Sequence, residues 1–245
     1  MPKMSVSVVT PAYLKSNSLL PFLLKLTDLL ENSNYEYEII VVIDGDHDQS
    51  SKILEEFCST RSTVKYLVHS KNLGKGAAVR TGVSAIGDAD YIAYLDADLD
   101  INSDALLSYL SHLEDNQHTD ILYASKTHQK SIVNYPLPRK IVSFVLQLLV
   151  RMLLRVQVQD TQTGLKVGKS KAMKDSILNT GTNGFAFDLE FFVNAKTAGY
   201  IIAPMPVEID FQFTSTVNIF HVFSVFVDLL KIAFWSRRNR NLRKI

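Results

Sequence analysis

The stretch Tyr91-Ile92-Ala93-Tyr94-Leu95-Asp96-Ala97-Asp98 joins five apolar residues to two carboxylates. A short run that is apolar throughout, rather than alternating with polar residues, is typical of a strand buried on both faces of a parallel sheet. In such sheets helices cover both faces, and ligands bind beyond the carboxyl ends of the strands. The stretch therefore predicts an α/β fold with polar binding residues at the end of a buried strand.

Similar strands alternate with helices along the first half of the chain. Strands are predicted at residues 5–9, 38–43, 64–68, 91–95 and 120–124, and helices at residues 19–30, 51–57, 75–85 and 103–113. This order predicts a mostly parallel sheet with helices on both faces. The second half is less regular, with helices expected at 140–155, 187–196 and 220–235 and strands at 163–167 and 200–209. Pro204 and Pro206 place the last strand near a sheet edge.

The composition fits a globular protein with one main domain. The net charge is only +1, so the overall charge does not indicate a partner. No repeat or low-complexity linker divides the chain, and we expect a catalytic domain at 1–215 followed by a separate segment at 216–245. The single cysteine, Cys58, cannot form an internal disulfide and favours a reducing compartment. Neither a signal peptide nor a long uncharged apolar run is apparent.

The carboxylates that follow Leu95 suit a divalent cation. Asp96, Asp98 and Asp100 lie within five residues of one another. Mg²⁺ and Mn²⁺ prefer oxygen ligands and often bind one or two protein carboxylates together with substrate phosphates. We therefore expect Asp96 and Asp98 to hold a metal that neutralises a diphosphate leaving group. A solvated acidic turn that caps the next helix is the simpler alternative.

Two further turns carry candidate binding residues. The glycine-rich turn Asn72-Leu73-Gly74-Lys75-Gly76 opens a predicted helix, whose N-terminus attracts phosphate, and Lys75 and Arg80 add positive charge. Its spacing fits neither a P-loop nor a dinucleotide-binding fingerprint, and a plain glycine turn is an equal alternative. The acidic turn Asp44-Gly45-Asp46-His47-Asp48 offers acceptors for a nucleobase or ribose, with Asx turns as the structural alternative.

Together these motifs resemble the inverting nucleotide-sugar glycosyltransferases of the GT-A fold, in the second sequence family of that class. The resemblance is carried by Val8-Val9-Thr10-Pro11-Ala12-Tyr13, Ile40-Val41-Val42-Ile43-Asp44-Gly45, Asn72-Leu73-Gly74-Lys75-Gly76 and Leu95-Asp96-Ala97-Asp98. It implies that Asp44 contacts the nucleoside and that Asp96 and Asp98 flank the metal and the donor sugar. The predicted nucleotide site also includes Pro11, Tyr13, Lys75, Arg80 and Gln162.

Motifs of the second half resemble those of dolichyl-phosphate glucose and mannose synthases and their bacterial polyprenyl-phosphate relatives. They are Ala124-Ser125-Lys126, Asp160-Thr161-Gln162-Thr163-Gly164-Leu165-Lys166, Phe185-Ala186-Phe187-Asp188-Leu189-Glu190 and Pro204-Met205-Pro206-Val207-Glu208. At three places the chain departs from the family pattern. Leu14-Lys15 stands where relatives usually carry Asn-Glu, Ile43 where they carry a second aspartate, and Lys126 where they often carry arginine. The first two departures touch the nucleotide site and leave the base open.

The resemblance implies transfer of a hexose from a nucleotide sugar, of the UDP-glucose or GDP-mannose type, to a polyprenyl phosphate. The transfer would be a direct displacement at the anomeric carbon, with inversion. A phosphate acceptor needs positive charge, for which Lys126 and Arg139 are candidates. A hydroxyl acceptor on a polysaccharide, teichoic acid or protein needs a general base instead, for which Asp188 and Glu190 are candidates. The structural alternative for these two acids is a favourable position at a helix N-terminus.

The end of the chain predicts contact with a membrane surface. The dense apolar helix at 220–235 is followed by five basic residues: Arg237, Arg238, Arg240, Arg243 and Lys244. An amphipathic helix with a basic tail binds anionic lipid, so we expect a cytoplasmic enzyme that is peripheral on the cytosolic face of a membrane. The alternative is a helix packed on the core with a solvated tail. Nucleic acid is not expected, because no aromatic platform accompanies the tail.

Two other classes of function remain open. A nucleotidyltransferase also combines a glycine-rich loop with metal-binding carboxylates, although the motifs of the second half do not fit it. An inactive relative that serves as a membrane-bound interaction module is the other class, and the presence of both Asp96 and Asp98 argues against it. The sequence leaves the oligomeric state open, including a homo-oligomer.

Overall fold

The computed structural model describes residues 3–97, 104–133, 160, 163–184 and 186–209. Several predictions lie outside these residues. They are the helices at 140–155 and 220–235, the boundary at residue 215, and the side chains Asp98, Asp100, Arg139 and Gln162.

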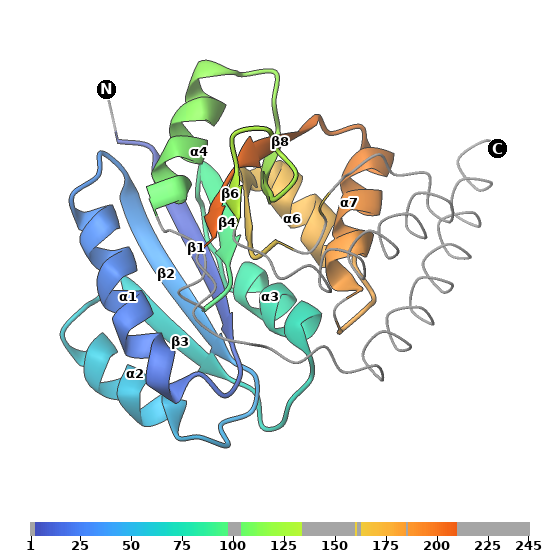
Figure 1. Ribbon diagram of the computed structural model, residues 1–245. Coiled ribbons are helices and arrows are strands. Elements are labelled where there is room, and N and C mark those ends of the chain that lie inside the picture. Colours follow the sequence, from blue (N-terminus) through green and yellow to red (C-terminus); the bar gives the residue numbers. More distant parts are fainter. Residues whose placement is uncertain (1–2, 98–103, 134–159, 161–162, 185, 210–245) are drawn as a thin grey trace.

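The first half of the chain alternates strands and helices, and the described part of the second half is less regular (Figure 1). The first half contains β1 (Ser5–Ala12), α1 (Ser16–Glu31), β2 (Glu36–Ile43), α2 (Ser50–Ser59), β3 (Val64–Val68), α3 (Lys75–Ser84), β4 (Tyr91–Leu95), α4 (Asp104–Asp115) and β5 (Ile121–Ser125). The second half contains β6 (Ile132–Val133), β7 (Leu165–Lys169), α6 (Ser170–Leu178), α7 (Phe187–Ala198), β8 (Ile202–Pro206) and β9 (Glu208–Ile209). The strands and helices predicted within the described residues are confirmed, with small shifts at their ends.

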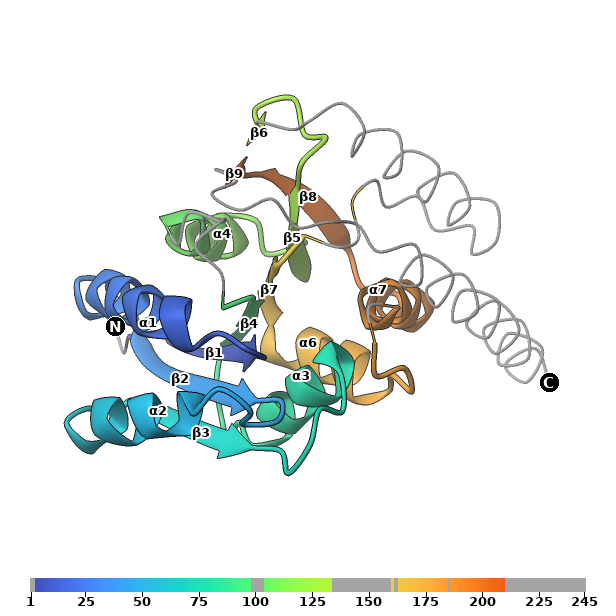
Figure 2. The same ribbon diagram turned by 60° about the horizontal axis from the view of Figure 1, so that its bottom comes forward.

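Seven strands form one sheet in the order β3-β2-β1-β4-β7-β5-β8. β1 runs parallel to β2 and β4, β2 parallel to β3, and β5 parallel to β8. Figure 2 shows the arrowheads of β1, β2 and β3 pointing the same way. Only β7 within this sheet is antiparallel to its neighbours, a direction that the sequence does not indicate. The mostly parallel sheet is confirmed, and β8 with its prolines lies at the edge as predicted.

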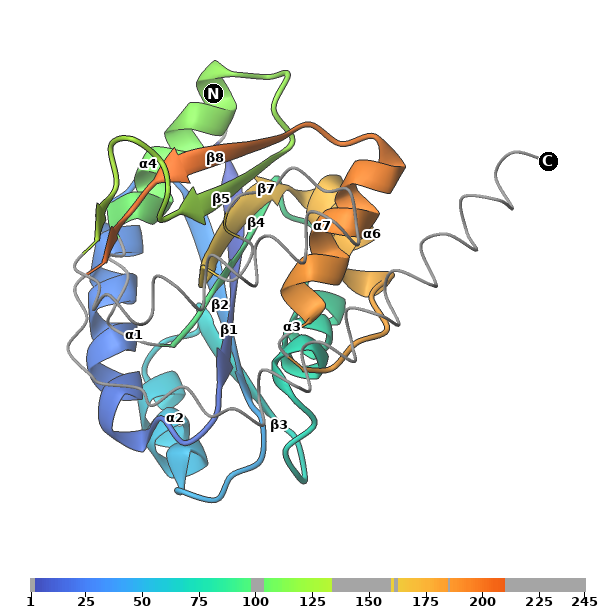
Figure 3. The same cartoon turned by 45° about the vertical axis from the view of Figure 1, so that its right-hand side comes forward.

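Helices cover both faces of the sheet, which explains why β4 and the second half of β2 are apolar throughout. In β1, Val8 packs into the core on one face and Val9 into the core on the other, because successive side chains of a strand alternate. Ile39 and Ile40 of β2 divide in the same way. Helices α1, α2 and α4 cover the first face, and α3, α6 and α7 cover the second (Figure 3). None of these helices is long and apolar enough to cross a membrane.

Helix α6 has no counterpart in the sequence prediction. It follows β7 without a loop, since the strand ends at Lys169 and the helix begins at Ser170. Its buried residues Ala172, Met173 and Ile177 do recur at helical spacing. A helix of only about two turns gives a weak periodic signal, which is why the pattern does not stand out.

Candidate active site

Three charged side chains meet beyond the carboxyl end of β4. Asp96 directly follows β4, Lys75 begins α3, and Asp188 is the second residue of α7. The ammonium nitrogen of Lys75 lies 2.9 Å from Asp96 Oδ2 and 3.3 Å from Asp188 Oδ2. The sequence places the three residues in separate motifs, and the fold brings them into one cluster.

Asp188 is enclosed by cationic and hydroxyl partners. Its side chain is 1% exposed, and Oδ1 accepts hydrogen bonds from Lys166 Nζ at 2.6 Å and from the hydroxyl of Tyr94. Burial raises the pKa of the Asp188 carboxyl to about 6, and the nearby Lys75 opposes this shift. Asp188 does lie in the first turn of α7, as the structural alternative predicted. Its direct partners, however, are two lysines and a tyrosine.

Lys166 is a residue of this cluster that the sequence interpretation missed. It lies in β7 with its side chain fully buried, and Nζ donates to the carbonyl of Thr163 at 2.7 Å. Nζ also lies 4.7 Å from the centre of the Tyr94 ring. Burial, together with the charge of Lys75, holds the pKa of Lys166 well below its ordinary value. The available signal was a lysine between the apolar residues Leu165 and Val167 of a predicted strand, which implies a buried partner.

Asp96 has an oxygen that fits a cation. Its Oδ1 atom is buried and has no hydrogen-bond partner in the described part of the chain, whereas Oδ2 accepts from Lys75. A Cβ atom at Gly164 would lie 2.5 Å from Asp96 Oδ2, so the glycine leaves the space that the carboxylate occupies. A hard divalent cation prefers such an oxygen. The second predicted ligand, Asp98, lies outside the described residues, and within them no group of three side chains is arranged to hold a metal.

Asp44 anchors the glycine-rich turn. Its Oδ1 accepts from the backbone nitrogen of Leu73 at 2.8 Å and lies 2.8 Å from Nδ1 of His69, and its Oδ2 accepts from the backbone nitrogen of Gly74 at 2.7 Å. These bonds attach the turn to the end of β2, a structural role that the sequence does not indicate. The contact of Asp44 with the nucleoside stays a prediction.

The other carboxylates of the acidic turn hold the starts of two helices. Asp48 accepts from the backbone nitrogen of Ser16 at 2.8 Å and from the hydroxyl of Ser50 at 2.7 Å. Asp46 accepts from the backbone nitrogen of Ser51 at 3.1 Å. Asp48 also accepts from the backbone nitrogen of Ser50, two residues on, at 3.3 Å, which is the Asx-turn pattern, whereas the bond of Asp46 spans five residues.

The predicted nucleotide residues at the end of β1 are partly accessible. Pro11 pairs with Val42 of β2, and Tyr13 directly follows the strand with 43% of its surface exposed. The Tyr13 ring meets the ring of His47 edge-on, with centroids 6.5 Å apart. An exposed aromatic ring at the binding edge of the sheet is suited to stacking on a base.

The glycine-rich turn packs against another part of the chain. The backbone nitrogen of Gly76 donates to the carbonyl of Asn183 at 2.7 Å. A Cβ atom at Gly76 would lie 2.5 Å from the carbonyl oxygen of Thr182 and 2.7 Å from Cβ of Phe187. Where the sequence predicts phosphate at the start of this helix, the atoms closest to Gly76 thus belong to Thr182 and Phe187.

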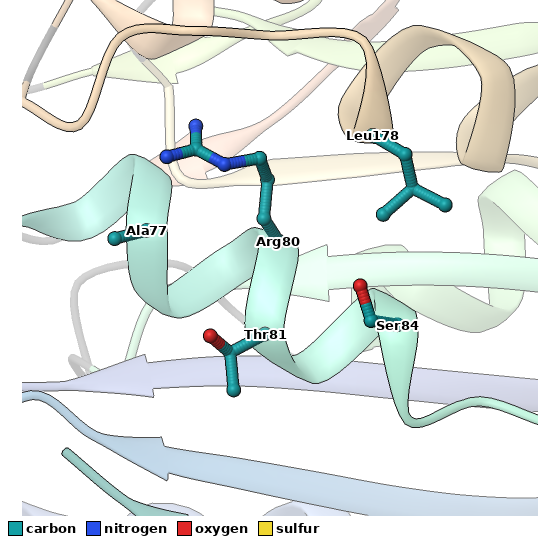
Figure 4. A pocket seen from close by; sticks show the side chains of 5 residues that line it. All are labelled: Ala77, Arg80, Thr81, Ser84 and Leu178. Carbon is teal, nitrogen blue, oxygen red and sulfur yellow. The ribbon is translucent and has the colours of Figure 1, made fainter.

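Arg80 holds the same segment from α3. Its Nη1 donates to the Thr180 hydroxyl at 3.0 Å and to the Thr182 carbonyl at 2.7 Å, and its Nη2 donates to the side chain of Asn183. Figure 4 shows Arg80 on the wall of a surface pocket that is also lined by Ala77, Thr81, Ser84 and Leu178. The structure thus gives Arg80 a structural role, and its role as a phosphate-binding cation stays a prediction without support from this geometry.

Glu190 binds that segment from α7. Its Oε1 accepts from the backbone nitrogen of Gly181 at 2.9 Å, and its Oε2 accepts from the backbone nitrogen and the hydroxyl of Thr182 at 2.8 and 2.7 Å. Glu190 is 5% exposed. Both oxygens of its carboxylate therefore already accept hydrogen bonds from this segment of the protein.

Lys126 lies directly beyond β5, where its backbone nitrogen donates to Oδ2 of the buried Asp160 at 2.7 Å. Charges on Asp160 and Lys126 affect the pKa of Lys166 in opposite directions, Asp160 raising it and Lys126 lowering it. Asp160 thus holds the backbone of Lys126 beyond the end of β5. The other predicted cation on that side, Arg139, lies outside the described residues.

The fold and the position of Asp96 define a class of protein, the GT-A glycosyltransferases. The same fold occurs in glucosyl-3-phosphoglycerate synthase from Mycobacterium tuberculosis, in a crystal structure with Mn²⁺, UDP and phosphoglyceric acid. The two structures superpose with a TM-score of 0.67, at 14% identity, over 94% of this chain and 78% of the other.

The chain belongs to glycosyl transferase family 2, whose model matches residues 7–181. It is 28% identical to the dolichyl-phosphate β-glucosyltransferase ALG5D of Trichomonas vaginalis, over 97% of this chain and 76% of the relative. It is also 28% identical to the dolichyl-phosphate β-glucosyltransferase of Mus musculus, over 84% of this chain and 67% of the relative. The family predicted from the motifs is confirmed, and the protein is a glycosyltransferase rather than a nucleotidyltransferase.

Proposed function

We propose that this protein transfers a hexose from a nucleotide sugar to a polyprenyl phosphate, and that the transfer requires Mg²⁺ or Mn²⁺. Similarity to dolichyl-phosphate β-glucosyltransferases over nearly the whole chain supports a polyprenyl phosphate as acceptor and glucose as the sugar. UDP and Mn²⁺ in a structure of the same fold support a UDP-linked donor and a divalent cation. UDP-glucose is therefore favoured over GDP-mannose.

The choice of a phosphate as acceptor rests on the hydrogen bonds and ion pairs that the two candidate general bases, Asp188 and Glu190, already make. A hydroxyl acceptor needs a general base, for which Asp188 and Glu190 are the candidates from the sequence. Glu190 accepts three hydrogen bonds from the segment at 181–182, and Asp188 is held by Lys75, Lys166 and Tyr94. A phosphate monoester, with a second pKa of about 6, is largely dianionic at neutral pH and needs no base. The geometry therefore favours a phosphate over a hydroxyl of a polysaccharide, teichoic acid or protein.

One group of residues would bind the donor and another would bind the acceptor. Asp96, with Asp98 as its predicted partner, would hold the divalent cation, which supplies positive charge for the diphosphate leaving group. Lys75 adds a positive charge beside Asp96. On the acceptor side, Lys126 and the predicted Arg139 would hold the lipid phosphate in line with the anomeric carbon, so that the sugar is transferred with inversion.

A lipid acceptor requires the enzyme to work at a membrane surface. The apolar residues at 220–235 and the five basic residues after Trp235 support a peripheral position on the cytosolic face, where anionic lipids attract basic segments. Removal of residues 236–245 should then weaken binding to vesicles that contain anionic lipid. Unchanged sedimentation with such vesicles would contradict the proposed role of the tail.

Mass spectrometry of the lipid product tests the function. The purified full chain is incubated with Mg²⁺ or Mn²⁺, a panel of UDP- and GDP-sugars, and a short polyprenyl phosphate. We expect a lipid-phosphate-sugar with one donor, lost on chelation and in Asp96→Asn, but retained in Asp88→Asn, whose carboxylate is exposed. Metal-dependent nucleotide binding without any lipid product would leave the family assignment intact and overturn the proposed acceptor.

A further inference from the structure

Lys75 forms an ion pair with Asp96, the carboxylate that is predicted to bind the metal. Its ammonium donates to Oδ2 of Asp96 at 2.9 Å, while Oδ1 of the same carboxylate is buried without a partner in the described part of the chain. The side chain of Lys75 is only 16% exposed, so solvent screens its charge poorly. An ammonium and a divalent cation on one partly buried carboxylate repel each other, because both are positive and lie within a few ångströms. A metal bound at Asp96 would therefore repel the ammonium of Lys75 from its present position.

Asp188 offers Lys75 a second partner. The distance from Lys75 Nζ to Asp188 Oδ2 is 3.3 Å, so a small rotation of the lysine side chain is enough to exchange one carboxylate for the other. Asp188 itself is fixed, since Lys166 and the hydroxyl of Tyr94 both donate to its Oδ1. These two donors leave Oδ2 directed to Lys75. The cluster thus contains one movable cation between two carboxylates, of which one is fixed.

We propose that Lys75 is an internal counter-ion that competes with the divalent cation for Asp96. In the absence of donor, Lys75 neutralises Asp96 and keeps its affinity for metal low. A nucleoside diphosphate brings negative charge that attracts both cations, so that Lys75 leaves Asp96 and the metal takes its place. Metal and donor consequently bind together rather than in separate steps. This inference rests on the proposed metal-dependent donor site, but it concerns binding alone and involves no acceptor.

Binding of Mn²⁺ to the full chain, followed by electron paramagnetic resonance of the free ion, tests the proposal without any transfer reaction. Wild type should bind Mn²⁺ weakly alone and more tightly with UDP. Lys75→Met should bind Mn²⁺ alone more tightly than wild type by about tenfold or more, the effect of removing a close like charge. UDP should also increase the Mn²⁺ affinity of Lys75→Met less than it increases that of wild type. Lys65→Met is the matched control, because Lys65 pairs with Glu38 on the surface and is 63% exposed.

Asp188→Asn provides a test in the opposite direction. With its second partner neutral, Lys75 should stay on Asp96 and weaken the binding of Mn²⁺, even in the presence of UDP. Thermal melting establishes that each variant is folded, and Asp188→Asn serves alone if Lys75→Met does not fold.

Equal Mn²⁺ affinity in wild type and Lys75→Met, or tighter binding in Asp188→Asn, would overturn the competition. Either result would leave the proposed transfer to a lipid phosphate unaffected, because the transfer assay tests that separately. If the Mn²⁺ affinities are as expected but no lipid product forms, the proposed acceptor is wrong and the competition between Lys75 and the metal is supported.

Discussion

The ammonium of Lys166 lies 2.6 Å from Oδ1 of Asp188, and the two side chains are 0% and 1% exposed. Lys166 lies in β7, the antiparallel strand, and Asp188 lies in the first turn of α7. The ion pair therefore joins the sheet to the helix behind the candidate metal site. A buried pair of this kind is sensitive to the loss of one partner, because the remaining charge stays desolvated.

Replacement of Lys166 by methionine should destabilise the protein strongly. Methionine fills a similar volume but leaves Asp188 with Tyr94 and Lys75 alone. The expected loss in the free energy of unfolding is about 3 kcal/mol, the lower end for a broken buried pair. Urea denaturation of Lys166→Met measures it, with Lys65→Met as the exposed control. A loss below about 1 kcal/mol would mean that the buried pair contributes no more to the free energy of unfolding than a surface pair does.

Replacement of Gly76 by alanine should disrupt the contact of the glycine-rich turn with Thr182 and Phe187. The new Cβ would lie 2.5 Å from the Thr182 carbonyl oxygen, closer than such atoms can approach. We expect a loss of about 1–3 kcal/mol, as for other overpacked sites. Gly87→Ala is the matched control, because its Cβ would meet no atom within 4 Å. Equal stability of the two variants in urea denaturation would contradict the packing role of Gly76.

Asp48 should contribute stability that depends on pH. Burial alone would raise the pKa of its carboxyl, but hydrogen bonds from Ser50 and Ser16 outweigh burial and lower the pKa below the ordinary value of 3.8. A depressed pKa in the folded state means that the contribution is present above the ordinary value and is lost as the pH falls through the folded value.

The variant Asp48→Ala measures this contribution. At neutral pH we expect a loss of about 1 kcal/mol in the free energy of unfolding, the usual net contribution of a hydrogen bond. The difference from wild type should shrink as the pH falls below 3.8. Asp88→Ala, which removes an exposed carboxylate, should show no such trend. A difference between Asp48→Ala and wild type that stays constant into acid would contradict the assignment.

Leu14 has a backbone conformation that its side chain disfavours. Its φ angle is +52°, in the left-handed region where asparagine is tolerated better than leucine. Because Leu14 is 54% exposed, little packing is lost on replacement. Leu14→Asn should therefore raise the free energy of unfolding by up to about 1 kcal/mol.

The control for Leu14 is another exposed leucine. Leu20, 38% exposed, lies inside α1, where asparagine is a poorer helix former. Leu20→Asn should lower the unfolding midpoint in urea, whereas Leu14→Asn should raise it. Destabilisation by both variants would show that packing of Leu14 outweighs its backbone strain. This position is also one of those at which the resemblance predicts asparagine and the chain carries leucine.

The sequence predicts the sheet and its two covered faces well, because both depend on local patterns. Apolar runs such as Tyr91–Leu95 identify buried strands, and the prolines of β8 identify an edge. The position of Asp96 at the end of β4 follows directly from such a run. The direction of β7 does not, since it depends on how a later part of the chain returns to the sheet.

The partners of the site residues could not be predicted, because they come from distant parts of the chain. Glu190 and Arg80 look like free charges in the sequence, yet both bind the segment at 180–183. Lys166 was overlooked because its partner, Asp188, is 22 residues away. Motif spacing identifies which residues are polar at the site, whereas only the fold determines which of them are already paired.

The most direct test of the account compares two acceptors that differ in a single group. The enzyme, Mn²⁺ and UDP-glucose are incubated with a short polyprenyl phosphate or with the corresponding polyprenol, and the lipid products are followed by mass spectrometry. We predict a glucosylated product from the phosphate and none from the alcohol, because Asp188 and Glu190 are occupied and a phosphate needs no base. Glucosylation of the polyprenol, or of neither lipid, would contradict a phosphate acceptor.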